Sequence, residues 1–448
     1  MLHSLQRLTS AHDPAAAAGP VPGADASSRR ADRTMVWVCA LWLTTFLLEG
    51  PLRAALQQFG VANLLYARDL IPVAGVVLGF AVPLVHRRAL APGLVLVTWL
   101  LAVHLCVGLL VGGTLFQRLF GLKMFMPLLF AVAIFPSVRN EFALFMRFMA
   151  CFFVVTVAGV LVNHAVGAMP WEGLTYDTAF GSMQTTKQWW IPGGTSRLPG
   201  FTRASFDAAM IIGVTGAMVL ALTRSRWLRA LIFAAGTVAI VLTTSKGMVV
   251  AFAVAAGWLL VANRSAASLT VGKFIACGLL VVTCLVPTLF MVVSVSENTN
   301  DVPDLLMSLW DRFSWMWPAA YALLPDGFGA LTGTGLGGIG TALAHAPEGT
   351  AWNAADSIFV YYFVTFGLVG IAYLAFPLLA VLGADADADP NAFVRVAVLI
   401  IAFGYGLSIN MIEQPVFATV FGLLYAQGFA RLRERLRQRE RERAHNLP

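Results

Sequence analysis

Long apolar segments recur along most of this chain and restrict it to a membrane-spanning helical fold. Of its 448 residues, 58% are hydrophobic and only 12% are charged, whereas soluble domains carry roughly a quarter charged residues. A helix that crosses a bilayer needs about 20 apolar residues, and the chain offers about twelve such segments. The sequence therefore predicts an all-α integral membrane protein with about twelve transmembrane helices.

Two long loops interrupt the otherwise closely spaced apolar segments. The predicted spans cover residues 35–50, 69–85, 91–111, 119–135, 143–162, 206–223, 229–244, 247–262, 274–294, 356–382, 394–411 and 414–430. The long loops run over about 163–205 and about 295–355. Because loops of this length without regular structure are usually functional, we expect the chemistry of the protein to lie near them.

Basic residues mark one side of the membrane as the cytoplasm. They gather before the first span and after the second, fourth, sixth, eighth and twelfth spans, at Arg29, Arg30, Arg33, His86, Arg87, Arg88, Arg139, Arg224, Arg226, Arg229, Arg264, Lys273 and the tail RLRERLRQRERER. The positive-inside rule then places both termini in the cytoplasm and both long loops in the periplasm of a bacterial inner membrane.

The chain divides into three parts on this interpretation. Residues 1–33 lack the apolar core of a signal peptide and are predicted to form a disordered cytoplasmic leader. Residues 34–430 form the polytopic membrane domain, and residues 431–448 form a basic cytoplasmic tail. The formal net charge of +7 comes from the basic loops and the tail, so it does not indicate a nucleic-acid partner.

An acidic residue stands at the periplasmic mouth of one predicted span. Asp356 opens the stretch DSIFVYYFVTFGLVG, and a carboxylate there is costly unless it faces water or a partner. Partial burial raises the pKa of a carboxyl group toward the range of a general base. Asp356, and secondarily His345, are therefore candidate catalytic bases. The alternative is that Asp356 and Ser357 only cap the following helix.

The predicted periplasmic face carries many cations, although the positive-inside rule disfavours them there. Lys and Arg are the usual phosphate binders. The candidate ligands of a diphosphate group are Arg312, Lys246, Arg197, Arg203 and Lys123. The alternatives are that Lys246 reaches the lipid headgroups or pairs with a neighbouring helix, and that Arg197 and Arg203 make structural ion pairs.

Aromatic and glycine residues cluster in the second long loop. Trp315 and Trp317 are candidates for stacking on sugar rings, with a membrane-interface belt as the alternative. The run GFGALTGTGLGGIG spans Gly327 to Gly340 and formally contains G-x-G-x-x-G. A dinucleotide site needs a βαβ unit around that motif. We therefore expect a tight turn that lets a substrate or a helix approach the backbone closely.

The sequence shows no metal-ligand spacing and implies no cofactor. The five cysteines all lie inside apolar segments. Asp385, Asp387 and Asp389 alternate with alanine in a predicted cytoplasmic loop, where we expect a solvated linker rather than a metal site.

The order of these motifs resembles that of the O-antigen ligase and O-antigen polymerase (Wzy-type) superfamily. Four elements over about residues 195–370 carry the resemblance. They are an R-x-x-G element at Arg197–Gly200, a T-x-S-R-G element at Thr243–Gly247 with Lys246 in place of Arg, an R-x-x-W element at Arg312–Trp315 followed by Gly333–Gly337, and an element that opens a span at Asp356 and continues to Gly367 and Gly370.

The resemblance implies a glycosyltransferase of the GT-C kind that needs neither a metal nor a nucleotide sugar. Its substrate would be an undecaprenyl-diphosphate-linked glycan, with membrane lipids, a flippase and a chain-length regulator as partners. Ligases that resemble this family carry His where Asp356 stands. The resemblance therefore favours an exopolysaccharide or O-antigen polymerase over a ligase that transfers glycan to lipid A core. A transporter or flippase of lipid-linked glycans is disfavoured, because no internal repeat is evident.

Overall fold

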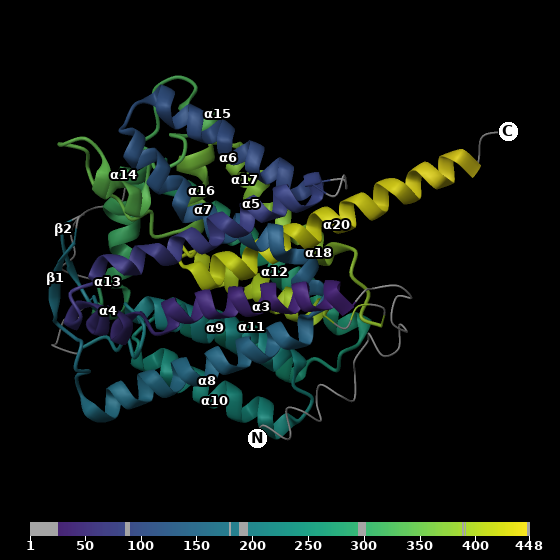
Figure 1. Ribbon diagram of the computed structural model, residues 1–448, viewed down its shortest axis with the longest axis horizontal. Helices are drawn as coiled ribbons and strands as arrows, with labels where there is room; N and C mark the ends of the chain where they lie inside the picture. Colours follow the sequence, from purple (N-terminus) through teal and green to yellow (C-terminus); the bar gives the residue numbers. More distant parts are fainter. Residues whose placement is uncertain are drawn as a thin grey trace.

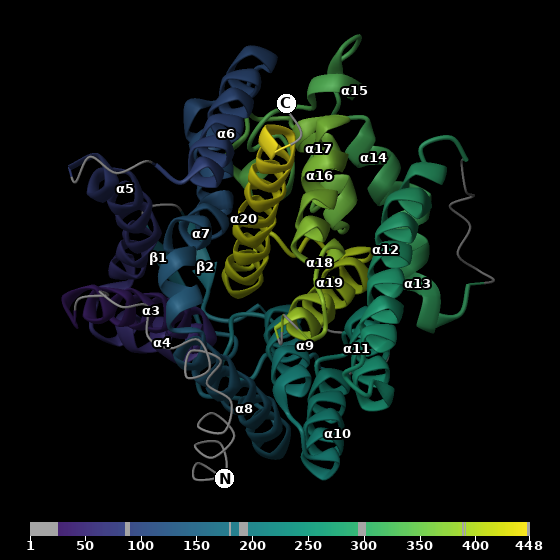
Figure 2. The ribbon, with the colours of Figure 1, turned by 90° about the vertical axis from the view of Figure 1, so that its right-hand side faces the viewer.

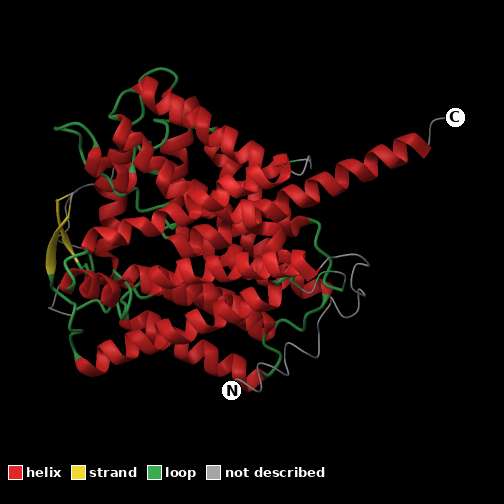
Figure 3. Ribbon diagram, viewed as in Figure 1, coloured by secondary structure: helices red, strands yellow, loops and turns green. Residues whose placement is uncertain are grey.

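The computed structural model describes residues 26–85, 90–178, 181–187, 196–293, 302–387, 389 and 391–445. Within these residues the chain forms a bundle of helices with one short β-hairpin (Figures 1 and 3). Strands β1 (Thr175–Thr178) and β2 (Gly181–Gln184) pair antiparallel. The hairpin and the short helices of the second long loop gather at one end of the bundle, which we call the hairpin end (Figure 1). Residues 1–25 of the predicted leader lie outside the described residues.

Every predicted span coincides with a helix or a series of helices. The long elements are α3 (Ala26–Leu47), α4 (Glu49–Gln58), η1 (Ala62–Asp69), α5 (Leu70–Val85), α6 (Pro92–Val111), α7 (Leu115–Asn140), α8 (Phe142–Val166), α9 (Ser205–Leu222), α10 (Arg226–Leu242), α11 (Lys246–Val261), α12 (Ala266–Leu289), α19 (Ala392–Gly406) and α20 (Pro415–His445). Six described helices are long and apolar enough to cross a membrane, or seven if the bent pair α3–α4 is one span. The structure is thus that of a helical membrane protein, and the number of about twelve spans stays a prediction.

Helix α19 forms the centre of the bundle, where nearly all of its side chains are buried. It packs against α9, α11 and α12 (Figure 2). Its sequence, AFVRVAVLIIAFGYG, is apolar on all faces apart from Arg395 near its start, as expected for a helix surrounded by other helices rather than by lipid on one side.

The ends of the chain are more helical than their sequence suggested. Helix α3 begins at Ala26, inside the stretch assigned to the leader, and Asp32 accepts hydrogen bonds from Ser137 Oγ (2.7 Å) and Asn140 Nδ2 (2.8 Å). Helix α20 continues from the last predicted span through the basic tail to His445, and its last turns project from the end opposite the hairpin end (Figure 1). Alternating Arg and Glu favour this continuation, because residues three and four apart pair on a helix surface.

Asp389 is not part of a solvated linker, contrary to the sequence-based prediction. Its carboxylate makes ion pairs with Arg395 of α19 and Arg431 of α20. The Asp389 carboxylate thus joins the start of α19 to the middle of α20. It also supplies the negative charge that two neighbouring, partly buried guanidinium groups need.

The second long loop and the following span are broken into short helices. They are α13 (Asp304–Asp311), the π-helical turn η2 (Arg312–Met316), α14 (Trp317–Tyr321), α15 (Gly329–Thr332), η3 (Gly340–His345), α16 (Ile358–Phe366), α17 (Val369–Ala375), η4 (Phe376–Leu378) and α18 (Leu379–Leu382). The predicted continuous span 356–382 is therefore wrong. It breaks at Gly367, whose φ is +66°, a conformation that costs glycine little.

The glycine run lies against this break and joins it to helix α7. Thr334 N and Gly335 N donate to the carbonyls of Val364 (2.7 Å) and Thr365 (3.0 Å). On the other side, Arg118 of α7 donates to the carbonyls of Thr334 (3.2 Å) and Leu336 (3.0 Å). The run is thus a place where helices approach the backbone closely, one of the two roles expected from its sequence.

Candidate functional site

An ion pair joins two of the candidate residues at the mouth of α16. Arg312 Nη2 donates to Asp356 Oδ2 at 3.1 Å, and the two side chains are 14% and 26% exposed. Arg312 is fixed by further bonds from its Nε to the Ser408 carbonyl (3.1 Å) and from its Nη1 to Ser308 Oγ (2.6 Å). It also opens the π-helical turn η2, and such turns are frequent at functional sites. The Arg312 guanidinium is therefore held by three neighbouring residues, and both side chains of the pair keep partial contact with solvent.

The backbone that presents Asp356 is strained. Ala355 and Asp356 have φ values of +69° and +34°, which are unfavourable for residues with a Cβ. Asn353 holds this backbone, because its Oδ1 accepts from Ala355 N (2.8 Å) and its Nδ2 donates to the Met316 carbonyl (2.8 Å). Strain of this kind concentrates at functional sites.

Asp356 does not cap α16. The N-cap position belongs to Ser357, whose side chain makes no capping hydrogen bond. The carboxylate of Asp356 instead faces Arg312. The alternative that Asp356 only caps the helix is therefore not supported by the structure.

Arg197 and Tyr405 complete this group. The charge of Arg197 interacts with those of Arg312 and Asp356 and with Tyr405. Its Nε is buried and has no hydrogen-bond partner within the described residues, and such a donor costs free energy unless an acceptor reaches it. We call Asp356, Arg312, Arg197 and Tyr405 the Asp356 cluster.

Burial raises the pKa of Asp356 above its usual range, because the ionised carboxylate is favoured by water. Arg312 and Arg197 lower that pKa in part. The carboxyl group of Asp356 can thus ionise, and its carboxylate is a stronger base than that of a solvated aspartate.

The turn before α11 lies against the Asp356 cluster. The Ser245 hydroxyl hydrogen-bonds Tyr405, and a Cβ on Gly247 would lie 2.4 Å from Ser408 Oγ. Lys246 is exposed at the start of α11. Lys246 thus follows and precedes residues that contact Tyr405 and Ser408, and the carbonyl of Ser408 holds Arg312.

Arg203 lies in a neighbouring group with several carboxylates. Its charge attracts the carboxylates of Asp207 and Glu49 and repels the neighbouring ammonium group of Lys187. Glu49 is 5% exposed and pairs with Arg53 and Arg68. We call Arg203, Lys187, Asp207 and Glu49 the Arg203 cluster. Because two carboxylates interact with Arg203, the alternative that Arg203 makes structural ion pairs has support here.

Comparison with known proteins adds no function to the geometry of these clusters. No protein-family model matches the chain, and no curated protein matches it significantly. A functional assignment therefore depends on the geometry of the two clusters and on the motifs of the sequence.

Sequence reasoning missed three carboxylates near these clusters. They are Glu49 in LLEGPLR, Asp207 in SFDAAM and Glu413 in NMIEQP. Glu413 accepts from Thr341 N at 3.0 Å, and burial raises its pKa. The signal that identified Asp356, a carboxylate at the edge of an apolar segment, was present at all three positions.

Lys123 and His345 lie close to each other and apart from the Asp356 cluster. Lys123 Nζ is 2.7 Å from Asp69 Oδ2 and lies 4.8 Å from the ring centroid of Phe120. The ring of His345 packs on Phe120 and Phe116 at centroid distances of 4.5 and 4.8 Å. Burial and the nearby Lys123 charge lower the pKa of His345. The structure thus brings these two residues to each other, and it brings Arg312 rather than Lys123 to Asp356.

The two tryptophans differ in access. Trp317 is fully buried and packs against Phe313 (5.2 Å) and Phe290 (6.1 Å between ring centroids). Its predicted role in stacking on a glycan is therefore wrong for this conformation, because its ring has no open face. Trp315 is 49% exposed and keeps a surface on which a sugar ring can stack.

Proposed function

We propose that this protein is a polysaccharide polymerase. It would transfer a growing lipid-linked chain to a new undecaprenyl-diphosphate-linked repeat unit at the periplasmic face. The observation that supports this most is the Arg312–Asp356 pair with Arg197 beside it. A basic carboxylate and two cations at one helix mouth supply both groups that such a transfer needs.

In the proposed reaction, Asp356 takes the proton of an acceptor hydroxyl group. The hydroxyl oxygen attacks the anomeric carbon of the donor, and the bond from that carbon to the diphosphate oxygen breaks. The electron pair of that bond goes to the diphosphate, whose added charge Arg312 and Arg197 stabilise. Preorganised cations of this kind supply a large part of many rate enhancements. Lys246 would extend the cationic surface along the lipid-linked group.

The order of the sequence motifs supports the assignment of this protein as a polymerase. The Asp356 cluster contains the first residue of three elements through which the sequence resembles the Wzy-type superfamily. The proposal includes a GT-C-like fold of about twelve spans, an inner-membrane location and cytoplasmic termini. The basic second half of α20, at the end opposite the hairpin end, fits a cytoplasmic side by the positive-inside rule (Figure 1).

The product of the purified protein tests the proposed function. We expect vesicles that contain the protein and undecaprenyl-diphosphate-linked repeat units to form a ladder of longer lipid-linked glycans, read by gel electrophoresis. Glycan attached to added lipid A core would identify a ligase instead. Movement of labelled lipid across the vesicle membrane without elongation would identify a flippase.

We expect the pH dependence of the polymerisation rate to follow the ionisation of the Asp356 carboxyl group. Because burial raises the pKa of Asp356, kcat/KM should fall as the pH drops through a value above about 4, the usual aspartate pKa. Arg312 lowers that pKa, so Arg312→Gln should move the acid limb to higher pH and also reduce the rate. Arg312→Lys keeps the charge and should leave the limb near its original pH. Identical limbs in Arg312→Gln and the unmodified protein would contradict the assignment of Asp356 as the base.

A further inference from the structure

Glu413 is a partly buried carboxylate in the turn between α19 and α20, residues 407–414, and it accepts hydrogen bonds from two other elements. Thr341 of η3 donates to it from its backbone N at 3.0 Å and also from its Oγ1. The hydroxyl group of Tyr361 in α16 donates to it as well. Hydrogen bonds to an ionised carboxylate are about twice as strong as those between neutral groups. Glu413 thus ties η3 and α16 to this turn.

The contact with η3 continues to the backbone that presents Asp356. Gly340 has a φ of +78°, and a Cβ on it would overlap Glu413 Oε1, so only glycine lets the carboxylate approach this closely. Gly340 N donates to the Asn353 carbonyl at 3.0 Å, and Asn353 Oδ1 accepts from Ala355 N at 2.8 Å. These contacts connect Glu413 to the strained turn that precedes α16.

The contact with α16 approaches Asp356 from the other side. Tyr361 follows Asp356 by five residues, and its backbone N donates to the Ser357 carbonyl at 3.0 Å. The Tyr361 side chain is only 1% exposed, and close packing resists movement of a buried ring. A shift of its hydroxyl group therefore also shifts the first turn of α16. Glu413 thus contacts the chain both before and after Asp356.

The turn that carries Glu413 also holds the basic member of the ion pair. Ser408 precedes Glu413 by five residues, and its carbonyl accepts from Arg312 Nε at 3.1 Å. Arg312 Nη2 in turn donates to Asp356 Oδ2 at 3.1 Å. One short turn between two helices is thus bonded to the supports of both charges.

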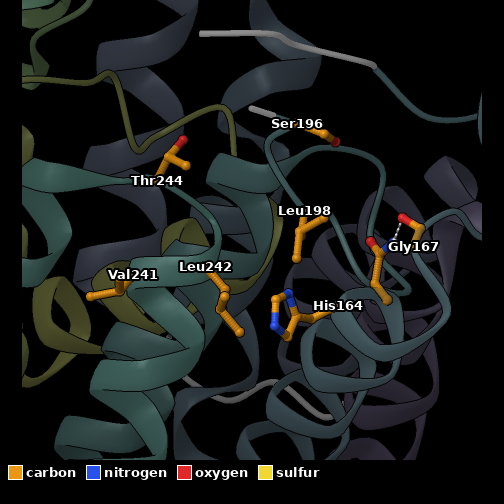
Figure 4. A pocket seen from close by; sticks show the side chains of 8 residues that line it. His164, Gly167, Ser196, Leu198, Val241, Leu242 and Thr244 are labelled. Atoms are coloured by element: carbon orange, nitrogen blue, oxygen red, sulfur yellow. Dashed lines mark hydrogen bonds between the residues drawn. The ribbon is translucent and has the colours of Figure 1, made fainter. Parts of the chain in front are cut away.

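The other cation near Asp356 is presented by a different segment. Arg197 lies between Ser196 and Leu198, which line a cavity of about 310 Å³ at the C-terminal ends of α8 and α10 (Figure 4). Among the described residues, this lining contains no group from η3 or from the turn with Glu413. A change at Glu413 should therefore move Asp356 and leave Arg197 in place.

We infer that Glu413 is a positioning residue for the base: its carboxylate fixes the strained turn that holds Asp356 against Arg312. The inference rests on the proposed function, because that function makes Asp356 the base. A displacement of about 1 Å at a reacting group can cost about 10²-fold in rate. The contacts of Glu413 need acceptor oxygens rather than a negative charge, so glutamine should replace most of its function and alanine none.

Alanine and glutamine at position 413 test this inference. We expect Glu413→Ala to lower kcat of polymerisation by about tenfold or more, and Glu413→Gln to keep most of it, since its amide oxygen still accepts from Thr341 N. KM for the lipid-linked repeat unit should change little, because the cations remain. Glu348→Gln is the matched control, since Glu348 is an exposed glutamate in the loop that Glu413 contacts, and it should make normal polymer.

The acid limb of the pH profile separates positioning from a loss of folded protein. Arg312 lowers the pKa of Asp356, so a wider separation in Glu413→Ala should raise that pKa and move the limb to higher pH. In an Arg312→Gln background, Glu413→Ala should add no further shift. Less folded protein would lower the rate equally at every pH. The charged and titratable groups that face the two carboxyl groups are Arg312, Arg197, Tyr405, Lys187 and Tyr361.

An unshifted acid limb in folded Glu413→Ala would overturn the inference. Loss of the limb in Glu413→Gln would also overturn it, because the limb would then belong to Glu413 itself. If Glu413→Ala does not fold, Thr341→Val removes one donor and should move the limb in the same direction. Thr350→Val is its matched control, because the Thr350 hydroxyl donates locally to the Pro347 carbonyl at 2.8 Å, and its limb should stay in place.

Hydrogen exchange tests the same inference without any activity. We expect Glu413→Ala to speed the exchange of the peptide that contains Ala355, whereas peptides from α9 keep their protection. Unchanged exchange at Ala355 would overturn the inference even in a protein that makes polymer. Faster exchange at Ala355 in a protein that forms no polymer would overturn the proposed function and leave the connection from Glu413 to Asp356 standing.

Discussion

Asp356→Ala is expected to abolish polymer formation while the protein still inserts into the membrane and lipid-linked single repeats accumulate. Loss of a general base typically costs 10²–10⁴-fold in rate, and the variant also leaves Arg312 without its anion. The side chain is partly exposed, so water can reach Arg312 and the fold should survive. The measurement is the length of lipid-linked glycan in cells or vesicles, with protein level followed in the membrane fraction.

Asp356→Asn separates the base from a structural role. Asparagine keeps the shape of the side chain and an oxygen that can accept a hydrogen bond from Arg312, but it cannot accept the proton. We therefore expect Asp356→Asn to be as inactive as Asp356→Ala. Asp326→Asn is the matched control, since Asp326 is an exposed carboxylate in the same long loop, and it should make normal polymer. Normal polymer in Asp356→Asn would remove Asp356 from the mechanism.

Gly335→Ala is expected to destabilise the fold severely. Gly335 has a φ of +74°, and a Cβ there would lie 2.2 Å from the backbone N and 2.4 Å from the Cα of Gly108 in α6. The left-handed backbone costs alanine about 1–2 kcal/mol, and overpacking against a helix backbone adds about 1–3 kcal/mol. Thermal unfolding of the purified protein in detergent measures the loss.

Gly349→Ala isolates the backbone contribution to that loss. Gly349 lies in the same long loop with a φ of +84°, but no atom lies within 4 Å of the position that its Cβ would take. It should therefore lose only the conformational part, about 1–2 kcal/mol. If the two variants unfold at the same temperature, the close approach of Gly335 to α6 contributes nothing to stability.

The helices were predictable because their cause is local. Apolar runs of sufficient length must satisfy their backbone hydrogen bonds internally in a bilayer, and each such run is helical in the structure. The break at Gly367 was not predictable in this way. Its backbone is stabilised by the carbonyl of Ala330, which accepts from Leu368 N at 2.9 Å, and that partner lies far away in the sequence.

The candidate site was predictable in composition but only partly in assembly. Arg312, Arg197 and Asp356 lie together, whereas Lys123 pairs with Asp69 and His345 packs on phenylalanines. All of these residues occur in or beside segments predicted to lie on the outer side of the membrane. Knowing the side of the membrane on which a residue lies does not identify its neighbours, because the helices are arranged by packing and not by hydropathy.

The sequence by itself determined that this protein is a helical membrane protein, and it singled out Asp356 as a carboxylate in need of a partner. Both follow from the cost of placing polar groups in or near hydrocarbon. Only the tertiary structure decided that the partner is Arg312, that Trp317 is closed to a ligand, and that Lys123 pairs with Asp69 instead. These depend on contacts between residues distant in sequence, which no local pattern specifies.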